Sequence, residues 1–277
     1  MAKATIQTKT HLKRADLQKL IKWDKSKIRS PLLLMGPRQV GKSTLLKQLA
    51  SSIGRKTYEV NFWEDPSEKL QSIFKKNGNA KNILKALADH FEVNSINTEE
   101  DVLLLDEIQE CQEAYSSLKS FKERTPELRV LATGSYLQLF LKNENLKKLP
   151  VGCVDEYKLT PLTFTEFLEN TNPSLFEKFQ KISISQLPIN EPLHDKLTQC
   201  LNDYFFTGGL PEVVQIYNVS EKNIETRSLI RKKQKDLLTQ YTLDFQKYGK
   251  SIYIKKIDKV FQSIPFQLEK SIDDSVS

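Results

Sequence analysis

Residues 36–43 read Gly-Pro-Arg-Gln-Val-Gly-Lys-Ser, and this segment constrains the fold more than any other part of the chain. It matches the pattern GxxxxGK[ST] at every fixed position, a match expected by chance in roughly one chain of this length in a hundred. An apolar run, Leu32–Met35, precedes it, and apolar residues at helical spacing follow over 43–53. In a strand–loop–helix of this kind, backbone N–H groups and the helix N-terminus converge on phosphate oxygens. The sequence therefore predicts a phosphate-binding loop.

The polar residues of this loop have expected roles toward ATP and Mg²⁺. Lys42 is expected to reach the β- and γ-phosphates and to assist catalysis, and Ser43 to offer its hydroxyl to the metal ion. The predicted ATP-binding residues are Gly36, Pro37, Arg38, Gln39, Val40, Gly41, Lys42, Ser43 and Thr44.

A second apolar run, Val102–Leu105, ends in the acidic pair Asp106 and Glu107. We expect Asp106 to hold Mg²⁺, directly or through water, and Glu107 to polarise the attacking water as a general base. Such a pair is typical of hydrolysing ATPases and disfavours the alternative of a small-molecule kinase with the same loop. An obvious lid with paired arginines, which a kinase of that kind would need, is also missing from the sequence.

A third apolar run, Leu128–Ala132, is followed by Thr133 and Ser135. A polar residue on the strand beside the acidic one can bond the γ-phosphate or the attacking water, and either residue fits this role. Ser135 is included among the predicted catalytic residues. Gln109 is a further candidate for orienting the water or this strand.

Alternating apolar runs and helical patterns predict an α/β fold with a parallel sheet. The expected strands lie at 30–36, 56–62, 101–107, 128–135 and 156–162, and the expected helices at 15–23, 43–53, 112–124 and 164–170. Strand patterns end near residue 170. A connector with one short helix is expected at 171–195, helices at 196–206, 221–247 and 250–261, and a turn at 208–212. We predict a nucleotide-binding core over 1–170 and a helical region over 171–277.

Composition excludes several other classes of protein. The three cysteines and three histidines are scattered, so neither a disulfide framework, a zinc site nor a histidine-based triad is expected. No apolar run approaches the ~18 residues of a membrane span, and the N-terminus lacks a signal-peptide core. We expect a cytoplasmic protein with no membrane partner.

The formal net charge is +7, and most of this excess lies in one segment. Residues 221–260 contain eleven lysines or arginines and five acidic residues. Such a segment can face an anionic partner, including nucleic acid, or can form an ordinary solvated helical face.

With these residues in view, the sequence resembles a family of predicted AAA-type ATPases of bacteria and archaea. The matching segments are GPRQVGKSTLL (36–46), LLLDEIQE (103–110), SLKSFKE (117–123), LATGSYL (131–137), LTPLTFTEFL (159–168) and YFFTGGLPEVV (204–214). The resemblance implies an AAA-type αβα P-loop core, nucleotide contacts at Gly36–Thr44, Asp106 and Glu107, and a sensing residue at Thr133 or Ser135.

Two departures from this family affect the expectations. Members usually carry a Gly-Arg pair before the last core strand, where this sequence has Gly152-Cys153. Members also usually continue into a winged-helix-like segment and a C-terminal domain of unknown function, often nuclease-like. We expect a truncated winged-helix-like ending here, and nuclease activity is not carried over.

Three functions follow as hypotheses. The first is Mg²⁺-dependent ATP hydrolysis coupled to movement of the helical region. The second is an ATP-dependent binding switch with slow or no turnover, and the third is a nucleic-acid-associated ATPase. A protein partner or a homo-oligomer is possible in each case. An arginine at the γ-phosphate, in cis or in trans, could come from Arg38, Arg124, Arg129, Arg227 or Arg231.

Overall fold

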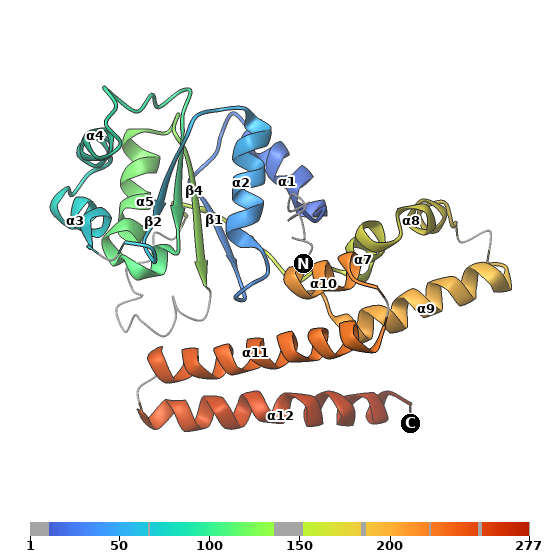
Figure 1. Ribbon diagram of the computed structural model, residues 1–277. Coiled ribbons are helices and arrows are strands. Elements are labelled where there is room, and N and C mark those ends of the chain that lie inside the picture. Colours follow the sequence, from blue (N-terminus) through green and yellow to red (C-terminus); the bar gives the residue numbers. More distant parts are fainter. Residues whose placement is uncertain are drawn as a thin grey trace, which may run out of the picture.

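A computed structural model describes residues 11–65, 67–135, 152–183, 187–221, 223–248 and 251–276. Its centre is a sheet of five parallel strands in the order β2-β3-β4-β1-β5 (Figure 1). The strands are β1 (Leu32–Gly36), β2 (Thr57–Asn61), β3 (Val102–Asp106), β4 (Arg129–Ser135) and β5 (Asp155–Lys158). The parallel α/β sheet predicted from the apolar runs is confirmed.

Helices cover both faces of the sheet. On one face lie α1 (Ala15–Asp24) and α2 (Lys42–Ile53), and on the other lie α3 (Lys69–Lys76), α4 (Ala80–His90) and α5 (Gln112–Arg124) (Figure 1). Successive residues of β1 enter opposite cores: Leu33 packs toward α3–α5, whereas Leu34 packs toward α1 and α2. A strand buried on both faces must be apolar throughout, which is why β1 and β3 appear as continuous apolar runs.

In the part of the chain that the structure describes, every element after β5 is a helix. Asn172 and Asn190 cap two of these helices through their side chains, and each is followed by a proline in the first turn. The helices are α7 (Phe164–Thr171), α8 (Pro173–Gln180), α9 (Glu191–Thr207), α10 (Pro211–Val219), α11 (Ile224–Tyr248) and α12 (Ser251–Val276). The predicted division of the chain at residue 170 stays a prediction.

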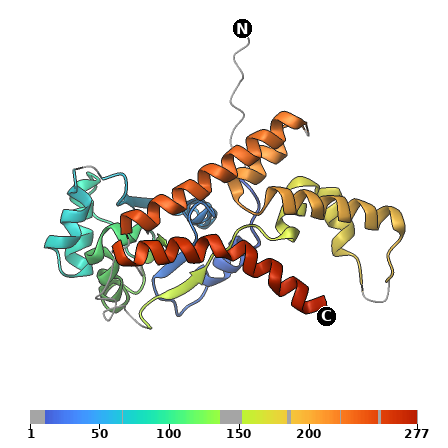
Figure 2. The same ribbon diagram turned by 90° about the horizontal axis from the view of Figure 1, so that it is seen from below.

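Helices α11 and α12 form a hairpin that passes below the sheet in Figure 1. Seen from below, they diverge from their connection (Figure 2). The rings of Tyr241 and Phe261 join them, with centroids 6.3 Å apart. None of the helices that the structure describes is long and apolar enough to cross a membrane.

Some elements differ from the sequence-based expectation. Helices α3, α4 and α10 and the short 3-10 turn η1 (Ile108–Glu110) were not predicted. Helix α12 extends to Val276 rather than ending near 261. The winged-helix-like ending is not confirmed, because residues 224–248 and 251–276 are two long helices.

Candidate functional site

The phosphate loop (residues 36–44) connects β1 to α2 at the edge where the parallel strands end. Gly41, just before α2, has a φ of 90°, a left-handed conformation that glycine adopts without strain. Gly36 lies against the segment after β5: a Cβ atom there would be 2.3 Å from the carbonyl oxygen of Leu159. Both fixed glycines of the sequence pattern are therefore needed for the shape of the loop.

Lys42 begins α2, and its ammonium group lies over the loop. Its Nζ donates to the carbonyl oxygens of Gly36, at 3.1 Å, and Pro37, at 2.8 Å. Burial lowers the pKa of Lys42, and the nearby positive charge of Arg38 lowers it further. The negative charges of Glu107 and Asp106 act in the opposite direction and raise it. The lysine predicted to contact phosphate is thus a desolvated cation beside two carboxylates.

Asp106, at the end of β3, joins three elements. The hydroxyl of Ser43 on α2 donates to its Oδ1 at 2.8 Å, and the hydroxyl of Thr133 on β4 donates to the same atom. Hydroxyl and carboxylate oxygens are the hard ligands that Mg²⁺ prefers, so this donor set fits the ion. The structure thus places the two predicted metal ligands, Ser43 and Asp106, in direct contact.

Glu107 follows directly and is oriented by its neighbours. Its backbone N–H donates to Thr133 Oγ1 at 3.1 Å, and its φ of 52° turns the chain away from the strand. The side-chain amide of Gln109 donates to the Glu107 carboxylate, and its oxygen accepts from the backbone N–H of Ser135 at 3.3 Å. Thr133 thus contacts both acids, whereas Ser135 joins the network through its backbone.

Two hollows lie on either side of the phosphate loop. One, which we call the cleft, has a volume of about 320 Å³ and is lined by Arg38, Gln39, Lys42, Asn61, Trp63, Glu64, Asp106 and Glu107. The other, of about 380 Å³, is lined by His11, Leu12, Arg14, Gln39, Val40, Gly41, Thr44, Leu45, Gln48, Pro211, Glu212 and Gln215. The first contains the predicted catalytic and metal-binding acids. The second has apolar walls from three separate segments and opens onto the same loop.

A family model described as an AAA domain matches residues 29–168, about half of the chain. The chain belongs to the AAA domain family. The matched segment includes all five strands, the phosphate loop and both acids, so the resemblance stated from the sequence is confirmed. A search of curated proteins found no significant match.

Solved structures resemble the chain at low identity. One is a STAND (Signal Transduction ATPase with Numerous Domains) protein with a tetratricopeptide repeat sensor from Pyrococcus horikoshii (17% identity, TM-score 0.45, 86% of this chain, 35% of that one). Others are the Aeropyrum pernix ORC1 protein in complex with DNA (16%, 0.43, 79% and 64%) and AMPPCP-bound DnaA from Aquifex aeolicus (14%, 0.41, 81% and 65%). The chain thus spans from about a third to two thirds of their lengths.

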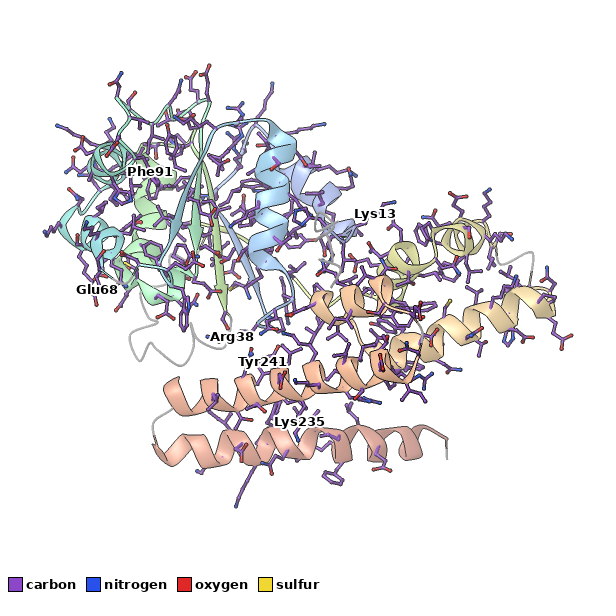
Figure 3. All side chains as sticks on the ribbon, viewed as in Figure 1. Lys13, Arg38, Glu68, Phe91, Lys235 and Tyr241 are labelled. Carbon is purple, nitrogen blue, oxygen red and sulfur yellow. The ribbon has the colours of Figure 1, made fainter. Side chains whose placement is uncertain are left out.

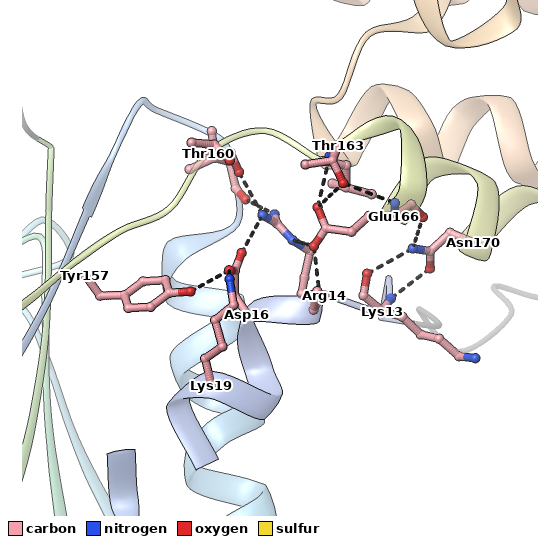
Figure 4. Close-up of polar contacts among 12 residues, drawn as sticks. Lys13, Arg14, Asp16, Lys19, Tyr157, Thr160, Thr163, Glu166 and Asn170 are labelled. Atoms are coloured by element: carbon pink, nitrogen blue, oxygen red, sulfur yellow. Dashed lines mark hydrogen bonds and ion pairs between the residues drawn. The ribbon is translucent and has the colours of Figure 1, made fainter. Parts of the chain in front are cut away.

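A buried ion pair between Arg14 and Glu166 lies next to the phosphate loop and contacts it (Figure 4). Arg14, which is 8% exposed, donates from Nε to Glu166 of α7 at 3.1 Å and from Nη1 to the carbonyl oxygen of Val40 at 3.0 Å. Its Nη2 donates to the carbonyl oxygen of Thr160 at 2.8 Å. One guanidinium group therefore ties the phosphate loop to the segment after β5 and to α7.

Helix α11 also contacts the phosphate loop. The hydroxyl of Tyr241 donates to the carbonyl oxygen of Arg38 at 3.0 Å, and Gln39 donates to the side chain of Gln240. Figure 3 labels Arg38 and Tyr241 close to each other, between the sheet and α11. The sequence analysis missed Arg14, Gln240 and Tyr241. Distances along the chain as large as 203 residues leave no local pattern to reveal such contacts.

Proposed function

We propose that this protein binds ATP with Mg²⁺ and hydrolyses it to ADP and phosphate. The observation that carries the proposal is the hydrogen-bonded chain from Ser43 through Asp106 and Thr133 to Glu107, which lies beside Lys42. A phosphate loop alone would serve binding. The oriented second acid is what adds a base for hydrolysis.

The triphosphate would lie along the phosphate loop, with Lys42 exchanging its bonds to loop carbonyls for bonds to phosphate oxygens. Ser43 and Asp106 would hold Mg²⁺, which when bound neutralises charge on the β- and γ-phosphates. The nucleoside would occupy the 380 Å³ hollow, where Leu12, Leu45 and Pro211 offer apolar contacts to a base.

In the hydrolytic step, the oxygen of a water molecule forms a bond to the γ-phosphorus. The bond from this phosphorus to the β–γ bridging oxygen breaks, and its electron pair leaves on ADP. Glu107 takes the proton of the water, and the amide of Gln109 keeps its carboxylate directed toward the cleft. Thr133 holds both acids in place from β4.

Hydrolysis would be coupled to the helical region through α11. Tyr241 and Gln240 contact Arg38 and Gln39, two of the loop residues that line the cleft. Loss of the γ-phosphate would change the backbone conformation of the phosphate loop at these residues. The position of α11, which contacts them, would change as a result.

Turnover and binding with Glu107→Gln test the proposal. This variant should bind ATP about as tightly as the wild type and lose turnover by at least ~100-fold, because the amide cannot accept the proton of the water. Glu127→Gln, which changes an exposed acid outside the site, is the matched control and should retain full activity. Tight ATP binding without turnover in the wild type would instead support the binding switch.

Binding itself is tested with Lys42→Ala. Loss of this cation should remove most of the affinity for ATP while the protein stays folded, since Lys42 contacts the loop rather than the apolar cores. Unchanged ATP affinity in a folded Lys42→Ala protein would overturn the assignment of the phosphate site.

A nucleic-acid-associated ATPase is a second candidate, because part of the basic segment is exposed. Lys232 and Lys235 on α11, and Lys256 and Lys259 on α12, have exposed side chains. Phosphate contacts by such residues weaken steeply with salt. The candidate predicts that DNA stimulates turnover at low salt and that added salt abolishes the effect. An absence of DNA binding at low salt would eliminate it.

A further inference from the structure

Of the five arginines that the sequence offers as partners for the γ-phosphate, four lie away from the cleft. Arg129 begins β4 and contacts Asp24, and Arg124 ends α5, so both lie at the edge of the sheet opposite the phosphate loop. Arg227 and Arg231 stack on Phe206, at 5.2 and 4.3 Å from its ring centroid. Because of these positions, Arg38 is the remaining candidate of the five for contacting the γ-phosphate within the same chain.

The position that carries arginine in the resembling family also lies at the far edge. Cys153 comes two residues before β5, whose first residue, Asp155, is in register with Leu32 at the start of β1. The phosphate loop follows the other end of β1. An arginine at 153 would therefore be a strand's length from the loop in its own chain.

We propose that Arg38 supplies, in cis, the positive charge that stabilises the γ-phosphoryl group during transfer, and that Trp63 positions it. The proposal rests on the ATPase function proposed above. Arg38 lines the same cleft as Lys42, Asp106 and Glu107, which no other of the five arginines does. It makes no covalent bond: its N–H groups donate to the γ-phosphate oxygens, whose negative charge a guanidinium group matches.

The residue is held at both ends. Its carbonyl oxygen accepts from Tyr241 of α11 at 3.0 Å, and its guanidinium lies over the indole of Trp63 at 5.7 Å from the ring centroid. Stacking on an aromatic face restricts the orientation of a guanidinium group. The 53% exposed Trp63 ring thus serves as a platform at the rim of the cleft.

Charge in the cleft agrees with this role. Arg38 and Lys42 line the cleft together with Asp106 and Glu107, so two cations share a small volume with two carboxylates. Repulsion between cations is relieved when a highly charged anion enters. A triphosphate with its metal ion provides such an anion.

The test compares Arg38→Ala with Arg124→Ala, an exposed arginine at the opposite edge. Arg38→Ala should lower kcat by about a thousandfold with ADP affinity within about threefold of wild type, because the lost contact belongs to the transition state. Formation of the ADP–aluminium fluoride complex, a mimic of the transferring phosphoryl group, should be lost. Arg38→Lys should recover part of both, and Arg124→Ala should behave as wild type. A kcat for Arg38→Ala within threefold of wild type would overturn the proposal.

Mixing distinguishes action in cis from action in trans. Arg38→Ala has an intact Lys42, and Lys42→Ala has an intact Arg38. If Arg38 reached the phosphate of a neighbouring copy, mixing the two variants would restore activity. We expect no restoration, and a clear rescue would contradict action in cis.

Trp63 provides a readout independent of turnover. The chain has two tryptophans, and Trp23 bonds to Asp155 at the far edge, so Trp23→Phe leaves Trp63 as the reporter. Its fluorescence should change when ADP–aluminium fluoride binds, and this change should vanish with Arg38→Ala. Trp63→Leu should lower kcat more than it alters the Kd of ATP, and Trp63→Phe should recover most of the loss. A Trp63 signal that is the same with and without Arg38 would contradict the positioning role. Failure of ATP binding in the wild type would instead refute the proposed function.

Discussion

Lys42 is the cation that we propose for phosphate binding, and its environment predicts a pH dependence of this binding. Burial lowers its pKa from the ordinary value of 10.5, so the ammonium group loses its proton at a lower pH than an exposed lysine. The affinity for ATP should therefore fall on the alkaline side before pH 10.5. Titration calorimetry across this range measures it. Lys42→Arg keeps its charge throughout and should show no such fall, and constant affinity in the wild type up to pH 10.5 would contradict the prediction.

Gly209 is a residue at which one added carbon should destabilise the fold. A Cβ atom there would lie 2.1 Å from the carbonyl oxygen of Leu162, and the Gly209 carbonyl oxygen accepts from the N–H of Leu162 at 2.7 Å. The backbone must therefore move, and Gly209→Ala should lower the free energy of unfolding by about 1–3 kcal/mol. Gly78→Ala is the control, since a Cβ there meets nothing within 4 Å. Equal melting temperatures for the two variants would contradict the prediction.

Between elements, the buried pair of Arg14 and Glu166 joins the segment before α1 to α7 (Figure 4). Arg14→Met leaves Glu166 buried without its cation and should lower the free energy of unfolding by about 3–5 kcal/mol. Replacing Glu166 by leucine as well should restore part of this loss. Lys119→Met, which breaks an exposed pair with Glu123 on α5, should change it by less than about 0.5 kcal/mol. Denaturant unfolding measures all three, and a loss below 1 kcal/mol for Arg14→Met would contradict the account.

The elements of the AAA core were largely predictable, because β1, β3 and β4 are buried along almost their whole length. Leu32–Met35 and Val102–Leu105 have apolar residues at every position, as a strand covered on both faces requires. Helix α4 carries a comparable signal: Asn79 caps it, and Ile83, Leu84 and Leu87 form its buried stripe. The sequence of α4 thus carries a helical pattern as clear as that of the helices that were predicted.

The site was predictable only where its residues lie close together in sequence. Gly36–Thr44 and the Asp106–Glu107 pair are local patterns. The choice between Thr133 and Ser135 was not, because it depends on which hydroxyl of β4 faces the end of β3. The structure brings the Thr133 hydroxyl to Asp106 and to the N–H of Glu107. The role of Ser135 in catalysis stays a prediction.

At the scale of the whole molecule, the α11–α12 hairpin lies against the loop edge of the sheet (Figures 1 and 3). If the conformation of the phosphate loop affects α11, the rate of backbone amide hydrogen exchange in residues 237–243 should depend on the bound nucleotide. It should differ between the Glu107→Gln protein with ATP bound and the wild type with ADP bound. Helix α8 is the internal control, and Tyr241→Phe should reduce the difference. Hydrogen-exchange mass spectrometry measures it, and identical protection in both states would contradict the coupling.

Some of the basic side chains in the segment 221–260 make contacts within the protein. Arg227 and Arg231 stack on Phe206, and Lys233 pairs with Glu212 at 2.6 Å, so part of this charge stabilises the packing of α11 on its neighbours. Exposed lysines such as Lys235 remain for an anionic partner. The charge excess therefore supports the nucleic-acid candidate less than a simple count suggested.

The most direct test of the central claim is a single turnover of ATP in ¹⁸O-labelled water, with protein in excess and Mg²⁺ present. The account predicts that the wild type releases ADP and phosphate containing one ¹⁸O atom from the attacking water. It also predicts that Glu107→Gln binds the same ATP without cleaving it. Wild-type protein that holds ATP intact, or a Glu107→Gln protein that cleaves it at the wild-type rate, would contradict the assignment of this site as a hydrolytic centre.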